Sequence, residues 1–209
     1  MNKSLLLLAA ALLVVGAGSM VGAGTQAIFT DSATSTGNSF TAGTVDLQLQ
    51  DVDETSTTTV AASISDALMA PGDPATMGWI EVTNTGTLAI RYAISTTDTT
   101  AAGANNVAMS AALTVDVDTR AATTVCTAAQ GGAGQAAVVT AGTLQTLAIG
   151  SSAAGQDAAP NGGDRVLAAS GAERLCFYVS LPSGTGSAAQ GGVASYTFTF
   201  DGEQTANNP

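Results

Sequence analysis

Short rows in which apolar and polar residues alternate constrain this chain more than any other feature. The period of two is clearest in residues 45–50 and 88–94, and it returns in 113–118, 175–181 and 196–200. Because successive side chains of a strand point to opposite faces, rows of this kind predict strands with one buried and one solvated face. β-Branched Thr and Val are abundant, and no convincing helical stripe follows the first 27 residues. An all-β fold is therefore predicted.

Turn-forming residues separate the rows. Pro71-Gly72-Asp73-Pro74 precedes a further predicted strand around Trp79, and Asn84-Thr85-Gly86 follows it. The second turn is typical of a hairpin and predicts that 77–83 pairs with 87–95. Many short strands divided by turns favour an antiparallel β-sandwich over a parallel α/β sheet.

The N-terminus has the outline of a secretory signal peptide. Residues 1–4 carry a positive charge, residues 5–15 are apolar, and a Gly- and Ser-rich stretch leads to Thr25-Gln26-Ala27. Small residues at 25 and 27 predict cleavage between Ala27 and Ile28, and hence a protein that is extracellular or on the cell surface. An uncleaved anchor over 4–24 is the alternative, and the shortness of the strongly apolar core favours cleavage.

Composition excludes many functions. The chain has no His, and its single lysine, Lys3, lies in the predicted leader. Ser-His-Asp and Cys-His nucleophile systems, His-based zinc sites, Schiff-base lysines and P-loops are therefore excluded from the mature chain. Loss of Lys3 makes the mature chain one unit more negative than the −11 of the full sequence. Nucleic acid and anionic membranes are poor partners for such a charge, no membrane insertion is expected after cleavage, and no cofactor is expected.

Two cysteines, Cys126 and Cys176, follow the export signal and predict one disulfide. A catalytic thiol is the alternative, but the chain offers no His to activate it. Between the cysteines, glycine-rich stretches flank the apolar run 136–149. We interpret about 127–175 as a Gly/Ala-rich, hairpin-like insertion, a flexible surface excursion held at its base by the disulfide.

Carboxylates are the only plentiful reactive groups. Asp51 with Asp53, and Asp116 with Asp118, are spaced so that each pair shares one face of a strand. These four residues are weak calcium candidates, because calcium needs six or more oxygen ligands and a solvated strand face explains the pairs equally well. Acid–base hydrolysis by such a pair is a weaker alternative still. No catalytic residue is predicted.

Several stretches together resemble a known family. Residues 22–31 read Gly-Ala-Gly-Thr-Gln-Ala-Ile-Phe-Thr-Asp, and residues 35–47 read Ser-Thr-Gly-Asn-Ser-Phe-Thr-Ala-Gly-Thr-Val-Asp-Leu. With Pro71-Gly72-Asp73, the turn at 84–88 and the closing 196–200 strand before Gln204, they resemble the TasA/camelysin family of secreted proteins. Members of that family carry a SipW-dependent type of signal peptide and are related to archaeal bundling pilins.

The resemblance implies a jelly-roll sandwich and, in fibre-forming members, an extracellular filament of the biofilm matrix. In assembled members, the segment after the cut completes a sheet of the neighbouring subunit by strand addition. In this sequence that donor strand would be Ile28, Phe29, Thr30, Asp31, Ser32 and Ala33. The implied partner is a further copy of the chain in a head-to-tail homopolymer, and other matrix components are additional candidate partners.

Some family members have been called metallo-endopeptidases, and this sequence departs from that activity because it lacks His and its cysteines are predicted to be bonded. The sequence as a whole predicts a non-enzymatic structural subunit. Its parts would be a signal peptide at 1–27, a donor strand and linker at 28–38, and a jelly-roll-like sandwich at 39–209. The main alternative is a monomeric surface adhesin that uses the 126–176 insertion as its contact loop.

Overall fold

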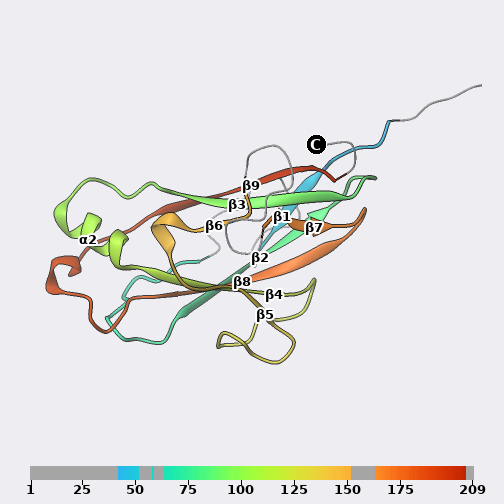
Figure 1. The fold of residues 1–209 in the computed structure, drawn as a ribbon. Helices are drawn as coiled ribbons and strands as arrows, with labels where there is room; N and C mark the ends of the chain where they lie inside the picture. The colour runs from blue at the N-terminus through green and yellow to red at the C-terminus, as the bar shows by residue number, and fades with distance from the viewer. Residues whose placement is uncertain (1–41, 52–57, 59–63, 152–162, 206–209) are drawn as a thin grey trace, which may run out of the picture. The chain divides into compact units, whose positions relative to one another are not determined.

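The computed structural model describes residues 42–51, 58, 64–151 and 163–205. Two antiparallel sheets are packed face to face in the unit that begins at Ala42 (Figure 1). The described strands and helices are β1 (Leu47–Gln50), β2 (Thr76–Asn84), β3 (Ile90–Asp98), α2 (Ala104–Ala112), β4 (Thr114–Ala121), β5 (Ala136–Thr143), η1 (Leu144–Thr146), β6 (Ala148–Ile149), β7 (Arg165–Leu167), β8 (Ala172–Ser180), η2 (Ser187–Ala189) and β9 (Tyr196–Gln204). The predicted all-β sandwich is confirmed.

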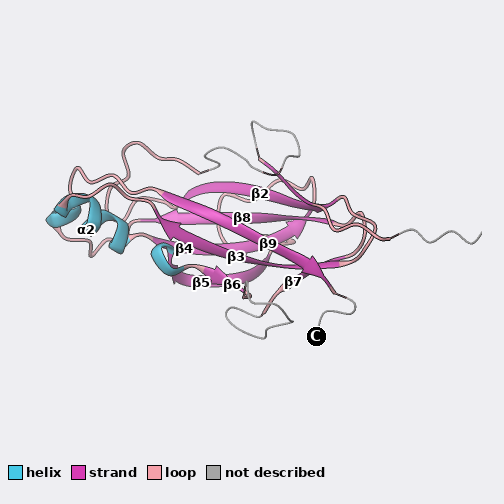
Figure 2. Cartoon of the chain, turned by 90° about the horizontal axis from the view of Figure 1, so that it is seen from above, coloured by secondary structure: helices cyan, strands magenta, loops and turns pink. Residues whose placement is uncertain are grey.

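The two sheets differ in width. The wide sheet has five strands in the order β1-β2-β8-β4-β5. The narrow sheet is built around β3, which pairs along its whole length with β9 on one side. On the other side β3 pairs first with β7 and then with β6, so the narrow sheet is only three strands across (Figure 2). The described part of β9 pairs with no strand other than β3.

The core between the sheets is aliphatic and aromatic. The predicted apolar rows supply it, since Ile80 and Val82 face inward from β2, Ile90 and Ile94 from β3, and Phe177 from β8. Ring pairs join the layers, with 5.1 Å between the centroids of Phe177 and Phe198. Burial of such side chains is the main force that holds two sheets together.

The predicted hairpin through Asn84-Thr85-Gly86 is wrong. β2 pairs with β1 and β8, whereas β3 belongs to the other sheet. Asn84 is fully buried, and its Nδ2 donates to the carbonyls of Leu88 at 2.8 Å and Ala168 at 2.9 Å. These bonds hold the connection as a crossing from one sheet to the other, which a local turn pattern does not distinguish from a hairpin.

The interpretation of 127–175 as a flexible, hairpin-like excursion is also wrong for its described residues. β5 extends the wide sheet beside β4, and β6 and β7 both pair with β3 in the narrow sheet. Leu144, Leu147 and Ile149 are buried in the core. The segment therefore supplies strands to both sheets.

The helix α2 has no complete apolar stripe, so the spacing of apolar residues does not predict it. Its sequence, ANNVAMSAA, contains four alanines, the residue with the strongest helix preference. Met109 and Ala112 pack against the core, while Val107 on another face is exposed. The high alanine content of this segment is the feature of the sequence that favours a helix.

The polar faces of the strands are less solvated than the alternation predicts. Arg91 on β3 is only 3% exposed and lies beside Glu203 and Asp164. On the wide sheet, Arg174 of β8 and Asp118 of β4 are buried beneath the loop that connects β4 to β5. Segments that are distant in the sequence bury these side chains, so the alternation of apolar and polar residues does not reveal their burial.

Candidate assembly surface

Two of the motifs behind the family resemblance, the described residues of 35–47 and the turn at 84–88, meet at one end of the sandwich, which we call the anchor end. The amide of Thr44 donates to Oγ1 of Thr87 at 2.9 Å, and the amide of Thr87 donates back to the carbonyl of Thr44 at 3.0 Å. Gly86 is required by close approach, because a Cβ there would lie 2.4 Å from the Thr44 carbonyl oxygen. The first described residues of the chain are thereby fixed against the connection between the sheets.

The interior at the anchor end contains a cluster of polar side chains that bond one another. Glu173 of β8 accepts a hydrogen bond from the Tyr92 hydroxyl at 2.8 Å and pairs with Arg165 of β7. Burial, and then the charge of Glu173, raise the pKa of Tyr92 well above its usual value. Paired charges and a buried tyrosine hydroxyl therefore form part of the interior at this end.

The opposite end of the sandwich contains an apolar cavity of about 450 Å³, which we call the β9 pocket. It lies beside the first half of β9, where residues 64–69 and the start of β2 also contribute to its walls. Its large apolar lining residues are Ile64, Met69, Met109, Leu113, Leu144, Val179, Val193, Tyr196 and Phe198. Clefts of this size and composition are suited to apolar side chains.

The edge of β9 borders this pocket. Tyr196, Phe198 and Phe200 point toward the core but are only half-buried. On its outer side β9 pairs with none of the described strands. A nine-residue edge with a row of incompletely covered aromatic residues is the kind of surface to which another strand can add.

A polar cluster holds the wall of the pocket in place. Asp98, at the end of β3, accepts hydrogen bonds from the hydroxyl of Ser110 on α2 and from Nε2 of Gln145 at 3.0 Å. The Ser110 hydrogen bond is the largest cause that lowers the pKa of Asp98 to about 2. Tyr196 donates to the carbonyl of Ser110 at 2.7 Å, so the same cluster ties β9 to α2.

The sequence motif Pro71-Gly72-Asp73 also lies at this end. Gly72 has a φ of +85°, and its amide donates to the carbonyl of Leu181 just after β8 at 2.8 Å. The carboxylate of Asp73 accepts from the amide of Ala70 at 2.9 Å. The motif therefore joins the chain before β2 to the end of β8, close to the pocket walls.

Three of the four weak calcium candidates lie among the described residues. Asp53 lies outside the described residues, and Asp51 is buried at the end of β1. Asp116 accepts from the amide of Ala141, and Asp118 accepts from the amide of Gly131 at 2.6 Å. Within the described ranges, no three His, Cys, Asp or Glu side chains come together as a metal site would require. Asp118 therefore holds the loop between β4 and β5, and Asp116 bonds β5 itself.

The predicted cleavage residues Ala27 and Ile28, and the predicted donor residues 28–33, lie outside the described part of the structure. Among the residues described, no helix is long and apolar enough to span a membrane.

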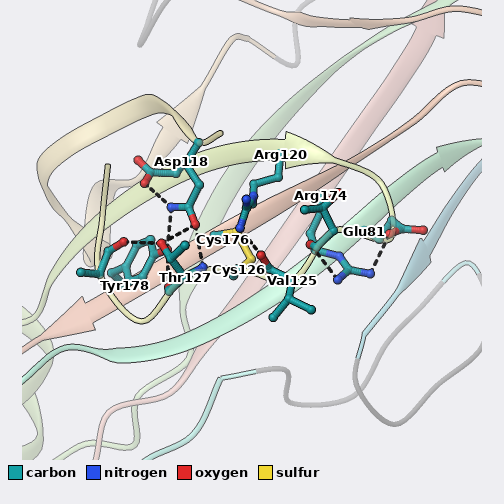
Figure 3. The surroundings of a disulfide bond; sticks show 12 residues. Glu81, Asp118, Arg120, Val125, Cys126, Thr127, Arg174, Cys176 and Tyr178 are labelled. Carbon is teal, nitrogen blue, oxygen red and sulfur yellow. Dashed lines mark hydrogen bonds and ion pairs between the residues drawn. A yellow bond between two sulfur atoms is a disulfide. The ribbon is translucent and has the colours of Figure 1, made fainter. Parts of the chain in front are cut away.

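The predicted disulfide is present. Cys126 and Cys176 are bonded, 50 residues apart in sequence, and the bond fixes the loop after β4 to the outer face of the wide sheet (Figure 3). On the chain-entropy model, a loop of this length contributes roughly 4 kcal/mol of stability. Beside the bond, the guanidinium of Arg174 lies 3.8 Å from the ring centre of Trp79 and pairs with Glu81 at 2.9 Å.

Comparison with known proteins agrees with the motifs. A family profile described as camelysin metallo-endopeptidase matches residues 5–127, which is more than half of the 209-residue chain. The search of curated proteins returned no match. The matched region includes the anchor-end motifs, the Pro71-Gly72-Asp73 turn and the strands from β1 to β4. The chain belongs to the TasA/camelysin family.

Proposed function

We propose that the mature chain is an exported structural subunit that polymerises head to tail into extracellular matrix or pilus-like filaments. Residues 28–33 of one copy would add as a strand to the open edge of β9 in the next copy. The observation that carries this proposal is that no described strand pairs with the outer edge of β9, which borders an apolar pocket at the end of the sandwich opposite the anchor end.

The separation of the two ends supports a filament. β3 runs nine residues from Ile90 near the anchor end to Asp98 near the pocket, a span of roughly 30 Å for extended chain. The N-terminal segment joins the domain at one end, and the surface that would receive it lies at the other. A contact between different surfaces of identical subunits does not close on itself, so repetition of this contact extends a fibre.

The N-terminal segment also has suitable composition and length. Between Ile28 and Thr41 the large apolar residues are Ile28 and Phe29, at the end farthest in sequence from the domain, and Phe40, next to the domain. Fourteen residues reach at most about 50 Å when extended. That length is enough to leave one subunit and run along the β9 edge of another.

A metallo-endopeptidase function is less well supported by the donor groups of the chain. The sequence has no His, and its two cysteines are bonded to each other. The described residues hold no group of three acidic, His or Cys side chains suited to a metal. Protein zinc sites are built mainly from His and Cys with some carboxylates, so the residues present do not fit a zinc centre.

The test is deletion of residues 28–33. We expect the mature chain to form filaments in negative-stain electron microscopy and the shortened chain to remain a monomer with an unchanged unfolding midpoint. Because the shortened chain keeps its β9 edge, it should also cap filaments of the intact chain and shorten them when the two are mixed.

The matched control exchanges Thr and Ser in the linker at 34–36, which alters side chains without removing the donor strand. This variant should polymerise as the parent does. Filaments formed by the shortened chain would refute the donor assignment. Monomers from the intact chain at every concentration and salt tested would refute the structural function and favour the monomeric adhesin.

A further inference from the structure

Asp66 contributes the one charged side chain among the described residues that line the β9 pocket. It is exposed, so its carboxylate lies at the mouth of the cavity. Its Oδ2 accepts a hydrogen bond from the hydroxyl of Thr76 at 2.6 Å, and its Oδ1 accepts from the amide of Leu68 at 2.9 Å. The bond from Thr76, and then the bond from Leu68, lower the pKa of Asp66 from 3.8. The mouth of the pocket is therefore negatively charged in neutral solution.

Asp66 has no cationic partner in the part of the chain that the structure describes. The ion pairs found there involve Arg91, Arg165 and Arg174, and none includes Asp66. Arg120 donates to carbonyls in the loop after β4. Each oxygen of a carboxylate has two lone pairs, so each oxygen of Asp66 can accept one further hydrogen bond. A positively charged donor beside an apolar group is the ligand that suits this pocket.

The mature chain would contain one positive group besides its arginines, the amino group at its N-terminus. The single lysine, Lys3, lies in the predicted leader. Cleavage between Ala27 and Ile28 would place the amino group on Ile28, the first residue of the proposed donor strand. Before cleavage, the same nitrogen belongs to an uncharged peptide bond. The free end of the donor strand would therefore carry both a cation and an apolar side chain.

The alternation of side chains decides which face of the donor strand turns inward. An added strand points successive side chains to opposite faces of the sheet. One face of residues 28–33 consists of Ile28, Thr30 and Ser32, and the other consists of Phe29, Asp31 and Ala33. With the second face inward, Asp31 would be buried against pocket walls whose described residues offer no cation. Burial of an unpaired carboxylate costs more than exposure of a phenyl ring, so Ile28 faces the pocket.

We propose that the α-ammonium group of Ile28 in one copy pairs with the carboxylate of Asp66 in the next copy, while the side chain of Ile28 fills the β9 pocket. This inference rests on the proposed function, because it assigns the residues that begin the contact between subunits. It also couples assembly to processing, since an uncleaved chain has no charge at Ile28 and continues past it. Filaments would then form only from chains that have lost the leader.

The first test is the binding of a synthetic peptide of residues 28–41, labelled with a fluorophore at its C-terminus. Fluorescence anisotropy measures its Kd for the mature chain, which is kept below the concentration at which filaments form. Acetylation of the peptide's amino group removes the charge and should raise the Kd about tenfold, as expected for loss of one hydrogen bond to a charged group. A single N-methyl group keeps the charge, and this matched control should bind as the free peptide does.

The second test changes the acceptor. Asp66→Asn removes the charge but keeps an oxygen that can accept from Thr76. This variant should bind the free peptide about tenfold more weakly, and it should not distinguish the free peptide from the acetylated one. The matched control Asp46→Asn removes one negative charge at the anchor end, and it should bind both peptides as the parent does.

The outcomes separate this inference from the proposed function. Equal binding of the free and acetylated peptides by the parent chain would overturn the ion pair and leave strand addition intact. A difference between the two peptides that persists in Asp66→Asn would overturn the assignment of Asp66. Failure of every peptide to bind would refute the donor strand itself, and this inference with it.

The intact chain provides a check in the filament. Because the mature chain would have no lysine, an acetylating reagent specific for amines would modify only its N-terminus. Acetylation should raise the minimum concentration for filament formation about tenfold, as it weakens binding of the peptide. Filaments that form from the acetylated chain at the parent's concentration would contradict the proposal.

Discussion

The two ends of the sandwich are built from the same strands but are completed differently. At the anchor end, Asn84 and Thr44 satisfy the backbone of the crossing connection, and Glu173 pairs with Arg165 inside. At the other end, half-buried aromatic residues of β9 border an apolar cavity. The polar groups of one end are therefore satisfied within the chain, whereas the other end presents apolar surface suited to a further strand.

The largest effect is expected from Asn84→Ala at the anchor end. The change leaves the carbonyls of Leu88 and Ala168 buried without their donor, which should lower the free energy of unfolding by about 3 kcal/mol. Urea unfolding followed by Trp79 fluorescence measures this. Asn105→Ala removes one exposed hydrogen bond to Gln190 and should cost less than about 1 kcal/mol. Equal losses in the two variants would mean that the anchor end is not specially dependent on Asn84.

A smaller effect on stability, with a clear effect on assembly, is expected from Ala194→Trp in the β9 pocket. The indole would occupy the cavity, so the minimum concentration for filament formation should rise about tenfold, equivalent to roughly 1.4 kcal/mol. Sedimentation across a concentration series measures this.

Val166→Trp adds similar bulk on the exposed side of β7 near the anchor end, and it should assemble as the parent does. Inhibition by both variants to the same degree would remove the distinction between the two ends.

The smallest effect is a change in acid sensitivity from Asp98→Asn at the pocket wall. The folded state keeps the pKa of Asp98 at about 2, below the ordinary value of 3.8, so the ionised carboxylate favours folding. That contribution is complete above about pH 4 and is lost as the pH falls toward 2. Thermal unfolding between these pH values should depend less steeply on pH in Asp98→Asn. The exposed Asp201→Asn should keep the parent's slope, and a parent-like slope in Asp98→Asn would contradict the role of this cluster.

Much of the sandwich could be predicted because its strands carry their own signal. Leu175, Phe177 and Val179 alternate along β8, and all three lie in the core between the sheets, as the period of two requires. What escaped prediction depends on distant partners. The turn at Asn84 is a crossing because its side chain bonds Ala168, and nothing local to residues 84–86 encodes that contact.

The candidate sites were predictable to different degrees. The Cys126–Cys176 bond followed from the number of cysteines and the export signal. The β9 pocket did not, because residues from α2, η1 and β9 meet there only in the folded chain. Asp118 was singled out as a carboxylate, but its contact with Gln135 joins residues whose proximity requires the loop to fold back on the sheet.

All four arginines of the chain are engaged within the domain. Arg91, Arg165 and Arg174 pair with carboxylates, and Arg120 donates to the carbonyls of Val125 and Ala133. The only other positive groups in the sequence are Lys3 and the amino terminus. A filament of such subunits would therefore present fixed negative charge with few compensating positive groups. It would behave as a cation exchanger that concentrates mobile counterions, draws in water osmotically and swells in fresh water more than in brine.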